Sequence, residues 1–330
     1  MKSLVTGGAG FIGSNLVDEL VRLGHHVTVL DNFSTGRRSN LSQHKKKNVK
    51  IVKVDISKEG KLDQHFKGIH YVFHLAALAD IVPSIENPDT YYKSNVIGTF
   101  NVVQASIRSK IKKFIYSASA SCYGFPKKFP TDEKEKIKPE YPYSFTKWQA
   151  EELIMHWAEL FKFPAISLRF FNIYGPRSRT SGAYGAVFGV FLAQKLSNSP
   201  LTIVGDGKQT RDFLHVKDLI RAIIKAAYSK KIGEIYNVAG GKEVTVNKIA
   251  QLVGGKTIRI PKRPGEPDRS LGNIKKIKKE LNWEPKIKIE AGVKNLIKNI
   301  NYWKEAPVWT PSKINKATKI WFQLIKKRNS

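Results

Sequence analysis

Residues 6–13 read TGGAGFIG, and this stretch decides the fold. A short apolar strand pattern runs into it, and an amphipathic helix pattern begins inside it. Gly7 permits a tight turn, Gly10 lets the backbone approach a pyrophosphate, and Gly13 lets the helix pack closely on the strand. The helix N-terminus adds unpaired N–H groups and a dipole that favours phosphate. The stretch therefore predicts a dinucleotide site between a strand and a helix.

Strand and helix patterns continue to alternate after this stretch. Further apolar strands are expected at residues 26–31, 49–56, 71–77, 112–119 and 163–175, with a helix over 95–109. Such alternation predicts a parallel sheet covered by helices on both faces. We predict an α/β fold: a Rossmann-type doubly wound parallel sheet over residues 1–175, to which a strand near 234–240 returns. Residues 176–330 are predicted to form mostly a smaller C-terminal α/β substrate domain, interleaved with the first.

The acid that ends the second strand indicates which dinucleotide is bound. A carboxylate at the position of Asp31 accepts both hydroxyls of an adenosine ribose and repels a 2′-phosphate, which favours NAD over NADP. Arg37 and Arg38 are the counterargument, because they could hold such a phosphate, but they lie several residues beyond Asp31. Asp55 and Ile56 end the third strand, at the expected adenine edge. The alternative role for Asp55 is to cap a helix.

The stretch YPYSFTKWQAEEL, residues 141–153, carries Tyr143 and Lys147 one helical turn apart, on the same helix face. One interpretation is an exposed helix with an aromatic ring beside a cation. The other is a phenol whose pKa is lowered so that it acts as a base. A free tyrosine titrates about three units too high for this, and the shift needs about 4 kcal/mol. Two close cations in a dry cleft, Lys147 and an oxidised nicotinamide, would supply it.

Charge and composition limit the classes of protein. Lys and Arg number 57 against 27 Asp and Glu, a formal net charge of +30. No DNA- or RNA-binding motif surrounds the lysines, so we expect a lysine-rich solvated surface without a specific nucleic-acid partner. The single cysteine, Cys122, excludes an intrachain disulfide and a cysteine-based zinc site, and we expect no metal site. No signal-peptide pattern and no bilayer-spanning apolar run are found, which predicts a cytoplasmic protein.

The last residues, 306–330, place aromatic side chains among lysines. Trp309, Trp321 and Phe322 could lie at a membrane interface on one side of a helix. Their spacing also fits a stripe that packs on a protein core. A docked C-terminal helix is the favoured interpretation.

With these features the chain resembles the extended branch of the short-chain dehydrogenase/reductase superfamily, the nucleotide-sugar epimerases and dehydratases. The resemblance covers nearly the whole chain and rests on TGGAGFIG, DNFSTG, HLAA, SASASCYG, YPYSFTKWQAEE, RFFNIYGPR, GDGKQTRDFLHVKD and RPGEP in combination. It implies NAD as cofactor, a UDP-sugar as substrate and usually a homodimer. The implied cofactor contacts are Gly7, Gly10, Phe11, Ile12, Gly13, Asp31, Asn32, Asp55, Ile56, Leu75, Ala76, Ala77, Tyr143 and Lys147.

The residues before the YG of SASASCYG indicate which reaction the resemblance implies. In the shared first step the tyrosine removes the proton of the sugar 4-OH while a hydride leaves C4. Family dehydratases carry a Thr-Asp-Glu-like triplet, and UDP-glucuronate decarboxylases typically keep a glutamate, where this chain has Ser119, Ala120 and Ser121. Without an acid there, the expected outcome is return of the hydride to the other face, which is C4 epimerisation. Both serines would hydrogen-bond O4, and capping the local turn is their alternative role.

Substrate contacts follow from the same resemblance. Asn172, Arg211 and Arg263 would hold the UDP portion. Ser270 is small where a bulky tyrosine narrows the pocket in enzymes restricted to glucose, so the UDP-glucose/UDP-galactose and UDP-GlcNAc/UDP-GalNAc pairs both remain open. Arg179 would meet a C6 carboxylate, which keeps UDP-glucuronate 4-epimerisation or decarboxylation as the alternative.

A protein of another class would use the same fold without catalysis. A non-catalytic NAD-binding sensor or a polyanion-binding protein is the alternative of this kind, because fold alone does not determine chemistry. The intact pair of Tyr143 and Lys147 argues against it. Salt-dependent retention on nucleic acid without turnover of UDP-sugars would favour it.

Overall fold

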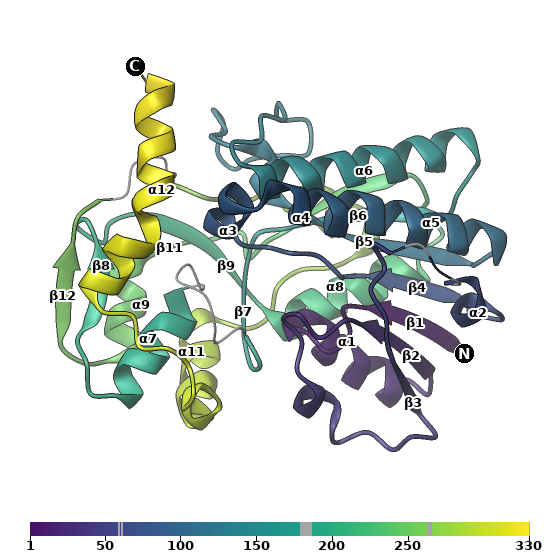
Figure 1. Ribbon diagram of the computed structural model, residues 1–330, viewed down its shortest axis with the longest axis horizontal. Helices are drawn as coiled ribbons and strands as arrows, with labels where there is room; N and C mark the ends of the chain where they lie inside the picture. Colours follow the sequence, from purple (N-terminus) through teal and green to yellow (C-terminus); the bar gives the residue numbers. More distant parts are fainter. Residues whose placement is uncertain (59, 61, 179–186, 263–265, 330) are drawn as a thin grey trace.

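The computed structural model describes residues 1–58, 60, 62–178, 187–262 and 266–329. Its centre is a seven-stranded sheet of order β10-β6-β5-β4-β1-β2-β3, in which every neighbouring pair is parallel (Figure 1). The strands are β1 (Lys2–Thr6), β2 (His26–Asp31), β3 (Val49–Lys53), β4 (Tyr71–His74), β5 (Lys113–Ser119), β6 (Ala165–Phe170) and β10 (Glu234–Val238). The predicted parallel sheet is confirmed.

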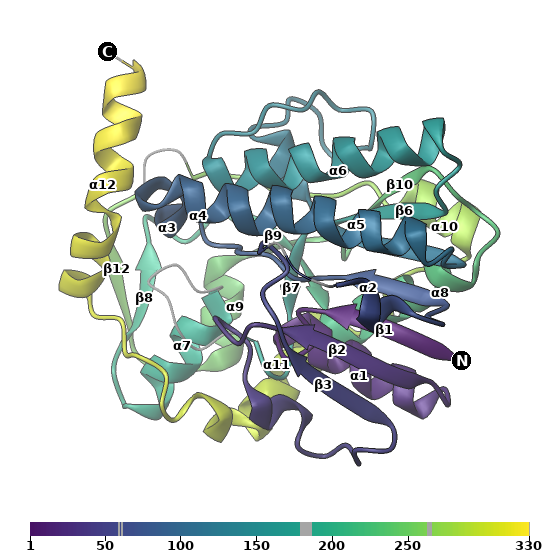
Figure 2. The same cartoon turned by 45° about the vertical axis from the view of Figure 1, so that its right-hand side comes forward.

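Successive residues of the central strands enter two separate cores, one on each face of the sheet. Leu4 packs in one core and Val5 in the other, and Val72 and Phe73 divide in the same way. One face carries α1 (Phe11–Arg22), α8 (Val216–Tyr228) and α10 (Lys275–Leu281). The other carries α2 (Asp63–Phe66), α5 (Gly98–Arg108) and α6 (Pro142–Leu160), as Figure 2 shows for α5 and α6. Because both faces are buried, the strands read as near-continuous apolar runs.

Short helical segments connect these elements. They are η1 (Arg38–Leu41), α3 (Ile81–Glu86), α4 (Pro88–Tyr92), the π-helical η2 (Lys93–Ile97) and η3 (Ala120–Tyr123). The helix expected over 95–109 is therefore a π-helical turn followed by α5.

A smaller set of elements builds a third core. It has a three-stranded sheet, β11-β9-β7, and a parallel pair, β12-β8. Its strands are β7 (Asn172–Tyr174), β8 (Leu201–Val204), β9 (Thr210–His215), β11 (Glu243–Thr245) and β12 (Thr257–Ile260). Its helices are α7 (Val187–Leu196), α9 (Val246–Val253), α11 (Ile289–Lys298) and η4 (Ile300–Trp303), followed by the terminal α12 (Pro311–Asn329).

The two halves of the chain are interleaved. The single strand expected over 163–175 is divided, because Phe171 still donates to the backbone oxygen of Val238 whereas β7 turns away to pair with β9. After β9, the chain returns to the large sheet through α8 and β10. The division of the chain at residue 175 stays a prediction.

Helix α6 presents the Tyr143–Lys147 pair. It begins at Pro142, whose fixed φ suits a first helical position. Tyr141 is its N-cap, and the Tyr141 backbone N–H donates to the Ser144 hydroxyl at 3.1 Å, which helps to fix the entry of the chain. The pair therefore stands in the first turns of a long, packed helix.

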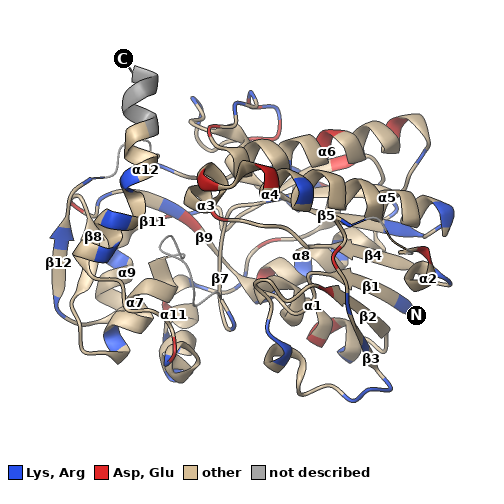
Figure 3. Ribbon diagram, in the orientation of Figure 1, with Lys and Arg blue, Asp and Glu red and all other residues tan. Residues whose placement is uncertain are grey.

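The C-terminal helix α12 is docked on the protein. Trp321 is 1% exposed, and α12 lies beside α3 in both views (Figures 1 and 2). Among the described helices, none is long and apolar enough to cross a membrane. Lys and Arg are spread over both halves of the molecule (Figure 3), as a solvated lysine-rich surface would have them.

Candidate active site

A cavity of about 740 Å³ lies at the carboxyl ends of the central strands, where the strand order reverses between β1 and β4. Ligands bind at this place in open α/β sheets. Its lining includes every predicted site residue that the structure describes: Gly7, Gly10, Phe11, Ile12, Gly13, Asp31, Asn32, Asp55, Ile56, Leu75, Ala76, Ala77, Ser119, Ser121, Tyr143, Lys147, Asn172, Arg211 and Ser270. Arg179 and Arg263 lie outside the described residues. The individual roles of these residues remain predictions.

The glycine loop has the space and the shape that a dinucleotide needs. Gly7 has φ of +67°, and a Cβ there would lie 2.7 Å from the backbone nitrogen of Ala76. A Cβ on Gly13 would lie 2.7 Å from the Cα of Gly8. Gly10 is the N-cap of α1, so the backbone amides of the first turn have no intrahelical hydrogen-bond partners. They lie at the end of the helix that meets the cavity. These residues fit a bound pyrophosphate.

Asp31 ends β2 against the same loop. Its carboxylate accepts hydrogen bonds from the backbone N–H of Ala9 at 2.9 Å and of Phe33 at 2.8 Å. Burial raises the pKa of Asp31, and the two amide hydrogen bonds oppose that rise. The arginines of the NADP counterargument lie over aromatic rings: the Arg38 guanidinium is 4.5 Å from the Phe33 ring centroid.

Asp55 stabilises a local turn and also lines the cavity. Its Oδ1 accepts from the Ser57 backbone N–H at 3.0 Å and from the Ser57 hydroxyl at 2.7 Å, so it caps a turn. It also lines the cavity beside Ile56. Capping therefore does not remove it from the predicted adenine edge.

The predicted reacting group of the site is the Tyr143 phenol. It hydrogen-bonds with the hydroxyls of both Ser119 and Ser121. The two serine oxygens are 2.8 Å apart, and Ser119 also accepts from the Ser121 backbone N–H at 3.2 Å. Turn capping by Ser119 and contact with the tyrosine thus occur together. The arrangement provides a short chain of hydroxyls through which a proton can pass.

Electrostatics in this structure differ from the sequence expectation at Tyr143. Burial raises the pKa of Tyr143, and the two serine hydrogen bonds oppose the rise. Burial also lowers the pKa of Lys147 to about 7, against the charge of Glu151. The expectation of a lowered Tyr143 pKa relied partly on the positive charge of an oxidised nicotinamide. Burial without that cation raises the pKa instead.

Lys147 is held by buried neighbours. Its Nζ lies 4.3 Å from the centroid of the Tyr116 ring, whose hydroxyl donates to the Lys147 backbone oxygen at 3.2 Å. One turn along α6, Glu151 pairs with Arg169 at 2.5 Å and accepts from Ser167 at 2.6 Å. This buried ion pair joins α6 to β6 beneath the site.

The predicted substrate contacts come from the smaller part of the fold. Arg211 on β9 donates to the Glu266 carboxylate at 2.7 Å and to the Thr210 backbone oxygen at 2.8 Å. These bonds hold its guanidinium in the cavity wall. Asn172 begins β7, and Ser270 lies half-buried on the same wall.

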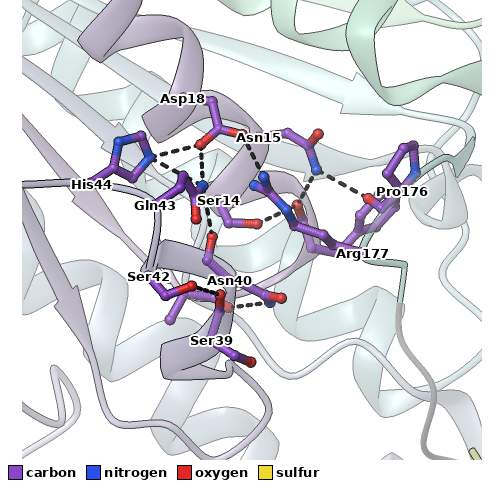
Figure 4. Close-up of polar contacts among 12 residues, drawn as sticks. Ser14, Asn15, Asp18, Ser39, Asn40, Ser42, Gln43, His44, Pro176 and Arg177 are labelled. Carbon is purple, nitrogen blue, oxygen red and sulfur yellow. Dashed lines mark hydrogen bonds and ion pairs between the residues drawn. The ribbon is translucent and has the colours of Figure 1, made fainter. Parts of the chain in front are cut away.

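A polar cluster that sequence reasoning missed ties the two halves together beside the glycine loop (Figure 4). Arg177 lies just after β7 with φ of +66°, a backbone conformation that is strained for a residue with a Cβ. Its guanidinium pairs with Asp18 of α1 at 2.7 Å, and His44 approaches the same carboxylate at 2.7 Å. Asn15 of α1 donates to the backbone oxygen of Pro176 at 3.2 Å. The cluster therefore joins α1 to the segment after β7.

The histidine of HLAA, His74, packs in the core. His74 is fully buried, and its two ring nitrogens meet the hydroxyls of Thr6 at 2.7 Å and Thr99 at 2.8 Å. Burial lowers its pKa to about 3. His215 is the N-cap of α8. Among the described residues, no group of three or more His, Cys, Asp and Glu could hold a metal ion.

Comparison with known proteins finds similarity over most of this chain. A family model described as "NAD dependent epimerase/dehydratase family" matches residues 3–239. A provisionally named UDP-glucose 4-epimerase of Methanocaldococcus jannaschii is 36% identical over 303 residues, which are 89% of this chain and 96% of its own. A UDP-N-acetyl-alpha-D-glucosaminuronate decarboxylase of Bacillus cytotoxicus is 31% identical over 313 residues, 90% of this chain and 96% of its own.

Solved structures agree. A UDP-N-acetylglucosamine 4-epimerase from Methanobrevibacter ruminantium, in complex with UDP-N-acetylmuramic acid, has a TM-score of 0.86 and 33% identity, and covers 92% of this chain and 97% of its own. Sequence, fold and cavity thus lead to one assignment. The chain belongs to the NAD-dependent epimerase/dehydratase family.

Proposed function

We propose that this protein epimerises a UDP-hexose at C4 through a transient 4-keto intermediate. The observation that carries the proposal is that the Tyr143 phenol hydrogen-bonds with Ser119 and Ser121 in a cavity that the glycine loop also lines. Positions 119–121 hold no carboxylate. The site therefore has a base and hydroxyl relays at the reacting carbon, and no acid there for elimination.

Each residue of the site has a part in this reaction. Bound NAD supplies the hydride acceptor and donor. Tyr143 takes the proton of the 4-OH and later returns it, while Ser119 and Ser121 hold O4. Lys147, in its protonated form, places a positive charge near the phenol and the cofactor ribose. Return of the hydride to the opposite face of C4 gives the epimer, and the cofactor ends in its starting state.

Asn172 and Arg211 are proposed to bind the UDP portion, with Arg179 and Arg263 as further candidates. The small Ser270 on the cavity wall supports a site that accepts a 2-acetamido group as well as a hydroxyl. UDP-glucuronate 4-epimerisation is the second candidate function, and Arg179 is the residue that favours it. A panel of UDP-sugars, followed by NMR of the anomeric protons, separates these functions. Appearance of C4 epimers supports the proposal, whereas a pentose product or no turnover contradicts it.

We also propose that the enzyme is a cytoplasmic homodimer, with the outer surface of α5 and α6 as its interface. Large apolar side chains are exposed there, with Phe161 at 59%, Leu160 at 60% and Phe100 at 38%. Trp157 joins them, since its ring lies 6.4 Å from that of Phe100 and 6.1 Å from that of Phe161. Contiguous exposed apolar surface of this kind marks interaction sites. NAD and a nucleotide sugar as reactants support the cytoplasm as the compartment.

A further inference from the structure

A tyrosine from far beyond the region that the family model matches lines the cavity. That region ends at residue 239, whereas Tyr302 lies in η4, at Ile300–Trp303. Tyr302 is half-buried and is part of the cavity wall. The next residue, Trp303, is 1% exposed and packs in the third core, which anchors η4. The structure therefore presents the Tyr302 side chain to the cavity from a packed base.

The segment after β2, residues 37–40, wraps around the glycine loop. The Arg37 backbone N–H and the Asn40 side-chain amide both donate to the backbone oxygen of Ala9, at 3.0 Å and 2.9 Å. The backbone N–H of Ala9 in turn donates to the Asp31 carboxylate at 2.9 Å. Arg37, Asn40 and Asp31 all line the cavity. This segment therefore borders the place that fits the pyrophosphate and the adenosine ribose of a dinucleotide.

Tyr302 joins η4 to this segment. Its hydroxyl donates to the side-chain oxygen of Asn40 at 3.2 Å, and the backbone oxygen of Arg177 lies 3.5 Å from the same hydroxyl. The Arg37 guanidinium is 5.8 Å from the centroid of the Tyr302 ring, within the range of a cation–π contact. Arg177 lines the cavity as well, and Figure 4 shows it with Asn40 in the polar cluster beside α1. Three distant parts of the chain thus meet at one phenol, at the cofactor end of the cavity.

We infer that Tyr302 is a latch on the NAD site: NAD enters and leaves when the contact between Tyr302 and Asn40 opens, and closure retains the cofactor. The inference rests on the proposed function, in which NAD ends each cycle as it began and has no need to leave between turnovers. A single hydrogen bond between neutral groups suits this role, because its net contribution is modest and the contact can open without unfolding the site.

The test measures NAD exchange in the full-length protein without any UDP-sugar. Protein loaded with radiolabelled NAD is chased with excess unlabelled NAD to give the release rate, and stopped-flow fluorescence gives the association rate. Tyr302→Phe removes the hydroxyl, and we expect both rates to rise by about fivefold, as loss of one net hydrogen bond allows. The Kd should stay within about twofold of wild type, because a latch must open in both directions. Tyr302→Ala also removes the ring beside Arg37 and should raise both rates by about tenfold or more.

The matched control is Tyr228→Phe, which removes a hydroxyl that hydrogen-bonds with His25 at 2.7 Å, outside the described lining of the cavity. It should exchange NAD at the wild-type rates. Because no sugar is present, these rates do not depend on turnover, and failure of the proposed function would be seen in the UDP-sugar panel alone. Wild-type rates in both Tyr302 variants would overturn the inference. So would a Kd that rises as much as the release rate while association is unchanged, because Tyr302 would then be an ordinary contact to bound NAD.

Discussion

Single residues carry the proposed cofactor preference and the proposed chemistry of the site. Asp31 ends β2, and its carboxylate accepts a hydrogen bond from the Ala9 backbone N–H of the glycine loop. Tyr143 hydrogen-bonds with two serine hydroxyls, and Lys147 is buried one helical turn away. The glycine turn and the spacing of Tyr143 and Lys147 are local in the chain, so the sequence was sufficient to predict them. The contact of Tyr143 with both serines needed the fold, because η3 and α6 meet only after packing.

The cofactor prediction concerns Asp31. Wild type should bind NAD more tightly than NADP, since the carboxylate pairs with ribose hydroxyls and repels a 2′-phosphate. Asp31→Ala should reduce that preference by about tenfold, mainly through weaker NAD binding. Isothermal calorimetry with both dinucleotides measures it. Equal wild-type affinities for the two would refute the role of Asp31.

A pH prediction follows from Lys147. Its pKa is about 7 in the fold against an ordinary value of 10.5. The folded state therefore binds this proton more weakly than the unfolded state does. Lys147 costs no stability above pH 10.5, and the free energy of unfolding falls as the pH decreases from 10.5 toward 7. Lys147→Met removes this pH-dependent loss of stability. It should raise Tm relative to wild type at pH 7, and much less at pH 9.5. The exposed Lys93→Met should shift Tm little at either pH, and a pH-independent gain for Lys147→Met would contradict the argument.

At the scale of elements, the structure shows how segments far apart in the chain complete the cavity. The segment after β7 is tied to α1 by the pair of Arg177 and Asp18, and η4 is tied to η1 because the Tyr302 hydroxyl donates to Asn40 at 3.2 Å. The sequence predicted the strands of the large sheet, although the strand expected over 163–175 is divided at Phe171. It could not predict these ties, because each joins residues more than a hundred positions apart and depends on packing that no local pattern encodes.

The tie between the halves is testable at Asp18. In the described residues Arg177 has a buried Nη1 without a hydrogen-bond partner, so the Asp18 carboxylate is its main compensation. Asp18→Ala should lower the free energy of unfolding by about 1–2 kcal/mol. Glu19→Ala, on the same helix but paired only with the exposed Arg22, should change it little. Urea unfolding measures both, and a loss in Glu19→Ala as large as that in Asp18→Ala would refute the brace.

At the scale of the whole molecule, the large parallel sheet and the smaller α/β part both line the cavity. The landmarks of the family were readable in the sequence. Trp321 was visible only as an aromatic residue in a basic tail, and its contact with Tyr141 depends on the course of the whole chain. The apolar surface on α5 and α6 is likewise a property of the folded molecule.

The proposed dimer is tested on that surface. Phe161→Glu places a charge in the proposed interface and should convert a dimer to a monomer in size-exclusion chromatography with light scattering. Ile258→Glu, on β12 and 42% exposed, is the matched control and should leave the molecular mass unchanged. A wild-type protein that is monomeric at all concentrations tested would rule out the interface.

The most direct test of the central claim is the rate of Tyr143→Phe on the UDP-hexose that wild type converts, with NAD and UDP binding measured on the same sample. The variant lacks only the hydroxyl that faces Ser119 and Ser121, so its fold and its nucleotide binding should be retained. General-base contributions are typically about 10²- to 10⁴-fold, and the account predicts a loss of epimerisation in that range. If Tyr143→Phe keeps most of the wild-type rate on every UDP-hexose tested, Tyr143 is not the base and the proposed mechanism is wrong.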